Sequence, residues 1–359
     1  MPAADAAKIA ELMVEADLIG ADAHGVFRLP QYMTRLKLGS TNAKPAIKVN
    51  RTAPATALVD GDNGMGHLVV SRAAETAIEM ARESGIAWVG CHMSGHAGAA
   101  GVYAALPLKA DMIGMYAAVA NANHMPLAGG AEPLLGTNPL AIAIPAGEEP
   151  PVVLDIATSI VSYGTIKNHK MLNRPLQGDW MIDPKTGEAV IDPQKSAEAL
   201  LLPMAGYKGA GLALMVGLLA GTLNGALFGR DCVDFNAEPD KVTNTGQFVL
   251  ALDPSKFQPL EQFKAEVDRH SRELRNSKPL PGNDAVRLVI HDVEGQETEF
   301  DLPRAAVSED LARSVEGIVK TVSDGDLAVR SRTIWEVSAG CAAATVFERG
   351  RETRHRVGE

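Results

Sequence analysis

The sequence has 359 residues, a formal net charge of −10 at pH 7 and a hydrophobic content of 46%. This length is sufficient for two domains or for one large core, and the acidic balance argues against a nucleic-acid or anionic-membrane partner. The three cysteines form no C-x-x-C pair, and the first residues contain no basic and apolar leader, so we expect a cytoplasmic protein.

The predicted elements alternate between helices and strands. Apolar residues spaced by three or four positions indicate helices, and short apolar runs indicate strands. In chain order, the first third predicts a helix at 5–19, a helix at 26–38, a strand at 56–62 with a turn at 63–66, a helix capped by Ser71 and ending at Gly85, a strand at 86–91, a helix at 97–109 and a strand at 112–119.

The same alternation continues in the rest of the chain. It predicts strands at 139–144 and 151–156, a loop region at 168–206, a helix at 209–228, a strand at 246–252, a helix at 259–276 and a hairpin within 286–302. Interleaved strands and helices place the chain in the α/β or mixed α+β class.

One segment has the composition of a membrane span. Residues 209–229 are uncharged, largely apolar and long enough to cross a bilayer. We interpret them as a fully buried core helix, because the segment is single, contains Asn224 and lacks the flanking aromatic or basic anchors of a span. A membrane-anchored protein is the alternative hypothesis for this segment.

Several common site motifs are absent from the sequence. The glycines at 61–66 and 206–211 follow the order G-x-x-G-x-G, which is not the G-x-G-x-x-G of a Rossmann fold. His92 and His96 are four residues apart, but Met93 stands where an H-E-x-x-H zinc site needs glutamate. We therefore expect neither a Rossmann domain nor a metal site.

Asp155 lies inside an apolar run, where an unpaired carboxylate is costly. Such a residue holds a backbone turn, a helix N-terminus or a ligand, and the sequence leaves these roles open. Another strand-like run begins with Gly-Thr-Asn-Pro at 136–139, in which the proline fixes a turn. Both runs therefore carry small polar residues at one end.

Two histidines stand in turns that contain glycine. His24 lies in Ala-His-Gly at 23–25, and His96 lies in Gly-His-Ala-Gly at 95–98. Histidine suits proton transfer to a carbonyl oxygen near neutral pH, and Arg28, one helical turn after His24, suits a substrate carboxylate. The residues alone are equally compatible with packing or capping histidines and with a surface ion pair for Arg28.

Five motifs, taken in order, resemble the malate/L-lactate dehydrogenase family of NAD(P)-dependent oxidoreductases, which is unrelated to the Rossmann-type lactate and malate dehydrogenases. The resemblance runs from about residue 5 to about residue 285. The motifs are Ala-His-Gly-Val with Arg-Leu-Pro at 23–30, Ser-Gly-His-Ala-Gly at 94–98, Gly-Thr-Asn-Pro at 136–139, Asp-Ile-Ala-Thr-Ser at 155–159 and Gly-Tyr-Lys-Gly-Ala-Gly at 206–211.

The resemblance implies hydride transfer between NAD or NADP and a small anionic 2-hydroxy or 2-oxo acid. Ureidoglycolate, sulfolactate and cyclic imino acids are the alternative substrates that it implies. It gives the acid/base role to His24, with His96 as the second candidate, and a substrate contact to Arg28. The implied cofactor-binding residues are Asn121, Thr137, Asn138, Asp155, Ala157, Thr158, Tyr207, Lys208 and Gly282.

The resemblance also implies a homodimer with a mixed-sheet cofactor domain at 61–254 and a helical, dimer-forming part at 1–60 and 255–359. Ala23 stands where the family usually carries serine, so a hydroxyl beside His24 is missing. Asn283 replaces the glutamate of a Pro-Gly-Glu element, and the chain beyond about residue 325 has no counterpart. These departures support a second hypothesis, a protein that keeps the fold without catalysis.

Overall fold

The computed structural model describes residues 1–280, and the predicted hairpin within 286–302 lies outside them. A seven-stranded mixed sheet forms its centre, with the strand order β1-β2-β3-β9-β4-β5-β6. Only β2 and β3 pair in parallel. The strands are β1 (Lys48–Ala53), β2 (Thr56–Gly64), β3 (Ile86–Ser94), β4 (Ile113–Ala118), β5 (Leu140–Ile144), β6 (Val152–Ile156) and β9 (Thr245–Leu252).

Seven α-helices are described within residues 1–280, together with a two-stranded ribbon of β7 (Met181–Ile182) and β8 (Leu200–Leu201). Two short 3-10 turns, Asp22–His24 and Val26–Arg28, connect the first two helices. The helices are α1 (Ala3–Leu18), α2 (Leu29–Leu38), α3 (Gly66–Ser84), α4 (Ala100–Ala104), α5 (Tyr163–Met171), α6 (Tyr207–Ala220) and α7 (Leu260–Arg275).

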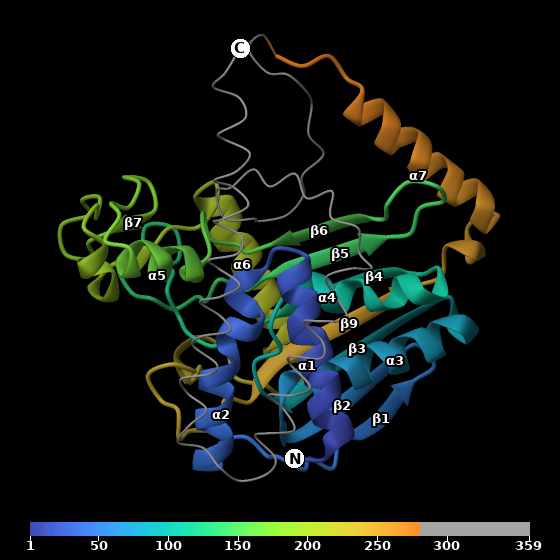
Figure 1. Ribbon diagram of the computed structural model, residues 1–359, viewed down its shortest axis with the longest axis horizontal. Coiled ribbons are helices and arrows are strands. Elements are labelled where there is room, and N and C mark those ends of the chain that lie inside the picture. The colour runs from blue at the N-terminus through green and yellow to red at the C-terminus, as the bar shows by residue number, and fades with distance from the viewer. Residues whose placement is uncertain (281–359) are drawn as a thin grey trace, which may run out of the picture.

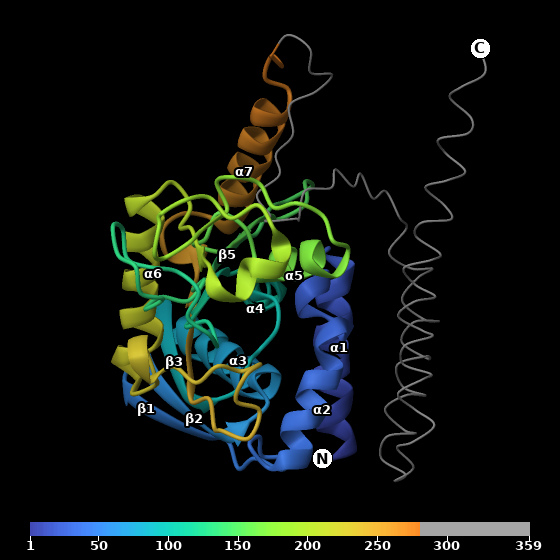
Figure 2. The same cartoon turned by 90° about the vertical axis from the view of Figure 1, so that its left-hand side faces the viewer.

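The helices cover both faces of the sheet. Helices α3 and α4 pack on one face, α1 packs against them from outside, and α6 packs against β4 and β9 on the other face (Figures 1 and 2). The largest apolar cluster lies between α3, α4 and the sheet and includes Val59, Val69, Ala73 and Val89, all fully buried. The many alanines of this layer let helix and sheet approach closely, which fits the low aromatic content of the chain.

Helix α7 projects from the body of the molecule (Figure 2). Its buried Asp268 accepts the backbone N–H groups of Gly147 at 2.9 Å and Glu148 at 2.8 Å, which lie in the β5–β6 connection. Arg272 and Arg275 pair with Glu149 of the same connection at 2.8 Å each. These contacts anchor the helix at one side.

The structure confirms the mixed α/β class and all six of the predicted strands. It adds β1, whose side chains are mostly exposed and therefore carry no apolar alternation. The expected domain boundary at residue 60 falls within β2, and β1 lies before it. Both strands belong to the central sheet. Residues 48–60 therefore belong to the sheet.

Several predicted helix boundaries were wrong. Helix α3 begins at Gly66, so Ser71 is a buried residue within it and not its cap. Helix α4 ends at Ala104 before a separate 3-10 turn that contains Pro107. Helix α5 falls partly in the region predicted as a loop, with Ser162 as its N-cap.

Helix α6 differs from the predicted buried helix in length and in exposure. It ends at Ala220, and none of the helices within residues 1–280 is long and apolar enough to cross a membrane. The helix is only half-buried, because Val216 and Ala220 pack against the sheet while Met215 and Leu218 are exposed. One apolar face of α6 is thus open to solvent in the single chain.

Candidate active site

The turn that carries His24 is fixed by the end of α1. The Asp17 carboxylate accepts the Val26 N–H at 3.1 Å. Gly25 leaves room for this contact, since a Cβ at that position would lie 1.7 Å from an Asp17 oxygen. The tight turn sets His24 beside the start of α2 and directs Arg28 back across it, where Arg28 Nε donates to the Ala23 carbonyl at 2.6 Å.

His24 and His96 come together although 72 residues separate them in the sequence. Their rings are nearly parallel, at an interplanar angle of 10° and a centroid separation of 6.0 Å. Both residues are partly exposed, and no hydrogen-bond partner of the His24 imidazole is found among residues 1–280. The two imidazoles therefore share one site with solvent access.

His96 is held by two hydrogen-bond partners at one ring nitrogen. The Tyr32 hydroxyl on α2 lies 2.6 Å from His96 Nδ1, and the Gly98 N–H points to the same nitrogen at 3.2 Å. Gly98 has a φ of +85°, and a Cβ on it would meet His24 and His67 at 3.2 Å each. The Gly-His-Ala-Gly segment therefore needs glycine at this position to fold its backbone over His96.

A segment from far along the chain closes the site. Arg35 on α2 is almost fully buried and donates to the carbonyls of Phe235 at 3.2 Å, Glu238 at 3.1 Å and Lys241. The Phe235 ring then packs against Tyr32 and His96, with centroid separations of 5.8 and 5.3 Å. Arg35 thus has a structural role and holds one wall of the site in place.

Both site histidines are neutral at pH 7 in the unliganded protein. Burial, with a smaller effect of the nearby Arg28 charge, lowers the pKa of His24 to about 4. The same two causes hold the pKa of His96 well below its usual value. Among the described residues, no three histidine, cysteine or carboxylate side chains gather as metal ligands.

Two cations face this site without a carboxylate partner. Arg28 is 9% exposed and donates to Gln31 Oε1 at 3.0 Å, while Lys167 on α5 donates to Asn236 Oδ1 at 3.2 Å. Neither forms an ion pair with a side chain that the structure describes. Burial and then the Arg28 charge lower the pKa of Lys167, so the two cations repel each other.

Asp234 is the carboxylate in this neighbourhood that acts on Lys167. Its charge opposes the fall in the pKa of Lys167, but it is the weakest of the three effects. One Asp234 oxygen already accepts the N–H groups of Asn236 at 2.8 Å and Ala237 at 3.0 Å. The positive charge of the site is therefore only partly offset.

The predicted cofactor-binding residues form a second, contiguous group. Thr158 donates its N–H and its hydroxyl to the Thr137 carbonyl, at 2.9 Å each. Asn138 is fully buried, accepts the Ala120 N–H at 3.0 Å and donates to the Ala213 carbonyl of α6 at 2.8 Å. The side chains of Thr158 and Asn138 are thus occupied by backbone, and they join β5, β6 and α6.

Asp155 holds the N-terminus of a helix. Its Oδ2 accepts the Gly101 N–H of α4 at 2.6 Å. Burial raises the pKa of this carboxyl to about 6, and the bond from Gly101 opposes the shift. Of the roles that the sequence left open, the structure shows this one.

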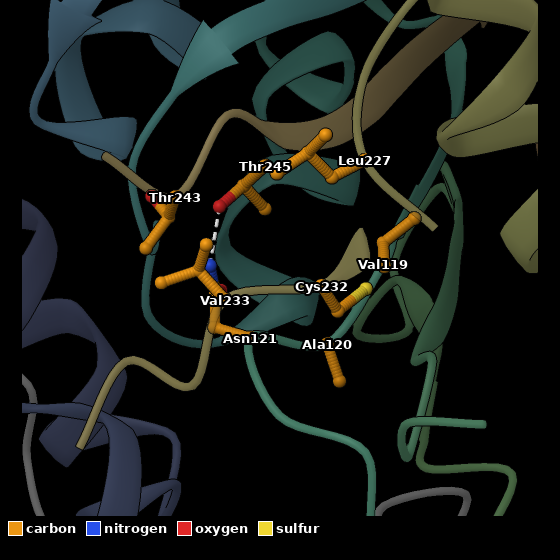
Figure 3. Close-up of a pocket in the computed structure, with 8 residues that line it drawn as sticks. All are labelled: Val119, Ala120, Asn121, Leu227, Cys232, Val233, Thr243 and Thr245. Atoms are coloured by element: carbon orange, nitrogen blue, oxygen red, sulfur yellow. Dashed lines mark hydrogen bonds between the residues drawn. The ribbon is translucent and has the colours of Figure 1, made fainter. Parts of the chain in front are cut away.

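Asn121 lines a small cavity with Val119, Cys232 and Thr245 (Figure 3). Its amide donates to the Thr245 hydroxyl, as the dashed line in Figure 3 shows. The cavity has a volume of about 10 Å³, which corresponds to about one water molecule. It is too small for a nicotinamide ring, so Asn121 would contact a cofactor only outside this cavity.

The start of α6 is open and has a lysine in its first turn. No side chain caps this helix, and the preceding Gly206 has a φ of +63° with open space around it. Tyr207 is 72% exposed, and Lys208 is exposed in the first turn. Free N–H groups at a helix N-terminus together with a lysine are a recurrent phosphate-binding arrangement.

The comparisons with known proteins identify the family of the chain. The sequence matches the malate/L-lactate dehydrogenase family over residues 1–294. The chain belongs to this family. It is 38% identical over 282 residues to the L-sulfolactate dehydrogenase of Methanocaldococcus jannaschii, covering 79% of this chain and 80% of that protein.

Two further relatives support the same assignment. The ureidoglycolate dehydrogenase (NAD(+)) of Escherichia coli is 33% identical over 302 residues, covering 84% of both chains. The solved structure of sulfolactate dehydrogenase from Methanocaldococcus jannaschii matches with a TM-score of 0.70 and 36% identity, covering 77% of this chain and 79% of that one. As a member of the malate/L-lactate dehydrogenase family, the chain is an NAD(P)-dependent oxidoreductase.

Within this family framework, the structure brings most of the predicted residues into two groups. His24, Arg28 and His96 form one group, and Thr137, Asn138, Thr158 and the start of α6 form the other. Ala157 lies beside Thr158 and is partly buried, whereas Gly282 lies outside the described residues.

Several site residues were not predicted from the sequence. Tyr32 follows His24 and Arg28 at intervals of four residues, and that spacing was a usable signal. Phe235 and Asn236 carry no local signal, because Arg35 positions their segment from about 200 residues away. His124 stacks on Tyr163 with a centroid separation of 3.7 Å and an angle of 3°, beside Lys167. This contact likewise depends on tertiary structure.

Proposed function

We propose that the protein is a dehydrogenase that transfers hydride between NAD or NADP and a 2-hydroxy or 2-oxo acid with a second anionic group. The single observation that carries this proposal is the pair of stacked neutral histidines beside two cations, Arg28 and Lys167, that lack ion-pair partners among the described residues. Family membership indicates the class of reaction, and these two cations favour a substrate with two anionic groups.

The cofactor would be held by the group of residues at the ends of β5 and β6 and at the start of α6. The N–H groups of Tyr207 and Lys208, with the Lys208 ammonium, would bind a phosphate, whereas the Gly209 N–H already donates to the Met204 carbonyl. Thr137, Ala157 and Tyr207 would line the cleft, with Asn121 further along it. When bound, the nicotinamide accepts or donates the hydride.

The substrate would lie between the two histidines and the two cations. Arg28 is pre-oriented by its bonds to Ala23 and Gln31 and would bind the carboxylate next to the reacting carbon. His24, neutral and without a protein partner in the described chain, would take the hydroxyl proton during oxidation and return it during reduction. Lys167 would bind the second anionic group.

Two like charges in a partly buried site cost free energy, and an anionic ligand relieves that cost. A substrate with two negative groups relieves it at both cations. A monoanion such as ureidoglycolate or a cyclic imino acid would pair only with one of them. These substrates are therefore the second candidates, and a ketimine reductase is the alternative reaction.

The test is the oxidation of NADH and NADPH by the purified protein, followed by absorbance, against a panel of acids. The panel contains oxaloacetate and sulfopyruvate as dianions, pyruvate as a monoanion and piperideine-2-carboxylate as a cyclic imino acid. The highest kcat/KM is expected with a dianion. Equal rates with pyruvate would contradict the role of Lys167, and turnover of the imino acid alone would establish the ketimine reductase instead.

We also propose a homodimer in which α6 takes part. Its solvent-facing side exposes apolar side chains at helical spacing, and an apolar helix face of this kind is typical of a protein interface. These side chains are Tyr207, Met215, Leu218 and Leu219, and Leu223 of the 3-10 turn after the helix is exposed as well. Sedimentation of the purified chain, with Leu218→Glu as the disrupting variant, tests this. A wild-type monomer at micromolar concentration would contradict it.

A cytoplasmic location is proposed from the cysteines. Cys91 and Cys232 are both free thiols, and neither is paired in the described chain. Fractionation of expressing cells tests this location. The division into a sheet-containing part and a helical, dimer-forming part also stays a proposal, with the sheet part beginning near residue 48.

A further inference from the structure

The inference concerns the hydrogen-bonding state of His96 and rests on the proposed function. His96 Nδ1 is the only ring nitrogen in the stacked pair with protein partners in the described chain. One partner is a backbone N–H, which can only donate. A nitrogen that receives the Gly98 N–H must offer a lone pair, so Nδ1 carries no proton in the neutral ring.

The second partner agrees with this assignment. Tyr32 is buried, and its hydroxyl, which either donates or accepts, has His96 Nδ1 as its partner at 2.6 Å. Burial strongly raises the pKa of Tyr32, with an opposing effect of Arg28, so the hydroxyl keeps its proton. With Nδ1 already bare, Tyr32 donates, and the ring proton of neutral His96 must be on Nε2.

A proton on Nδ1 is disfavoured for a geometric reason. Tyr32 can rotate its hydroxyl and accept, but the Gly98 N–H is fixed by a backbone with a φ of +85°. An imidazolium would therefore place two N–H groups against each other. The charges of Arg28 and Lys167 act in the same direction, since each lowers the pKa of His96 in addition to the larger effect of burial.

We infer that Tyr32 and the Gly98 N–H together hold His96 as the neutral Nε2–H tautomer, and that Tyr32 is a positioning residue of the site. His96 is then a hydrogen-bond donor to the oxygen of the substrate and not the group that removes its proton. The base is His24, which has no such donor on either nitrogen in the described chain. The two histidines thus have different roles although their rings are stacked.

The first test is the ¹⁵N NMR spectrum of the full chain labelled at its histidines, without cofactor or substrate at pH 7. The signals of His96 are identified by their loss in His96→Gln. The expected spectrum has a protonated Nε2 and an unprotonated Nδ1. A proton on Nδ1 would overturn the inference, and this readout requires no enzymatic activity.

Tyr32→Phe tests the positioning role. The variant is expected to populate both tautomers and to lower kcat about tenfold, the size of one hydrogen bond, with an unchanged KM for the nicotinamide cofactor. A spectrum identical to the wild type would show that Gly98 alone sets the tautomer and would overturn the role of Tyr32.

A pair of glutamine substitutions separates the two histidines. Glutamine keeps an N–H donor but cannot act as a base at neutral pH. His96→Gln is expected to retain activity within about 10-fold of wild type, and His24→Gln to lose about 10²–10⁴-fold. The reverse order would overturn the assignment of the base. If the tautomer is found but no acid is turned over, the proposed function fails and the positioning stands.

Discussion

Asp17 and Val26 form the contact on which the position of His24 depends. The carboxylate at the end of α1 accepts the Val26 N–H at 3.1 Å, and it lies where a side chain on Gly25 would stand. This bond closes the turn that carries His24, whose imidazole is stacked with that of His96. The N-terminal helix is therefore part of the support of the active site.

The first prediction concerns Gly25→Ala. The new Cβ would lie 1.7 Å from the Asp17 oxygen, so the carboxylate must move and the turn must open. We expect kcat to fall by about one to two orders of magnitude, as for other displacements of about 1 Å in a catalytic group. Steady-state kinetics measure this effect. Gly178→Ala, whose Cβ makes only an ordinary contact, is the matched control.

The second prediction concerns Lys167→Met. Loss of the ammonium removes one charge-assisted contact, so kcat/KM for a dianionic 2-oxo acid should fall about 10- to 100-fold. The value for pyruvate should change by less than about threefold, because a monoanion does not need this cation. Lys170→Met is the control, since Lys170 is exposed on the same helix. A parallel loss for both substrates would exclude Lys167 as the specificity residue.

The third prediction concerns pH. His24 must be neutral to take a proton, and burial lowers its pKa to about 4 in the unliganded protein. For oxidation of the hydroxy acid, the protonation of His24 should leave kcat/KM unchanged from pH 7 to about 5. As the pH decreases further through about 4, kcat/KM should fall. His24→Ala should lower kcat by about two to four orders of magnitude. Wild-type activity in that variant would refute the assignment.

The fourth prediction concerns His67, whose two ring nitrogens are buried without hydrogen-bond partners in the described chain. Burial lowers its pKa to about 3, so the unfolded chain binds a proton below pH 6.5 that the folded chain cannot bind. Stability therefore falls as the pH decreases through this range. In His67→Met this contribution is absent.

The measurement is urea unfolding of both proteins at pH 7 and pH 5, without ligand. The stability of His67→Met relative to wild type should increase by about 2 kcal/mol between these values, from 1.36 kcal/mol per pH unit over about 1.5 units. If the stability difference between the two proteins is the same at pH 7 and pH 5, His67 binds a proton at pH 5 in the folded protein as it does in the unfolded chain. The imidazole would then need a partner that the buried site does not show.

The sequence predicted those parts of the fold whose side chains face one layer. Helix α1 buries Ile9, Leu12, Met13 and Ala16, which are the four residues that define its periodicity. Strand β1 was not predicted, because it is an exposed edge strand whose side chains do not alternate between apolar and polar. The predicted boundaries of α3 and α4 were wrong. Helix α3 begins at Gly66 and not after the expected cap Ser71, and α4 ends before a 3-10 turn that contains Pro107.

The candidate site was predictable only where its motifs are local. His24, Arg28 and His96 stand in short turns that glycine marks in the sequence, and the structure brings them together. The wall formed by Phe235 depends on three bonds from Arg35 to backbone carbonyls, which no spacing in the sequence encodes. For Asp155, the sequence showed a carboxylate inside an apolar run, but only the structure shows that it accepts the Gly101 N–H at the start of α4.

The position of β9 has a consequence for how the chain is made. This strand, at 245–252, lies between β3 and β4 and, in the described residues, is the only strand that pairs with both halves of the sheet. During synthesis on the ribosome, β1–β3 and β4–β6 emerge well before the strand that joins them, and their inner edges stay unpaired. The two site histidines belong to the first half and Lys167 follows the second, so the sheet that supports the active site becomes continuous only when β9 has been made.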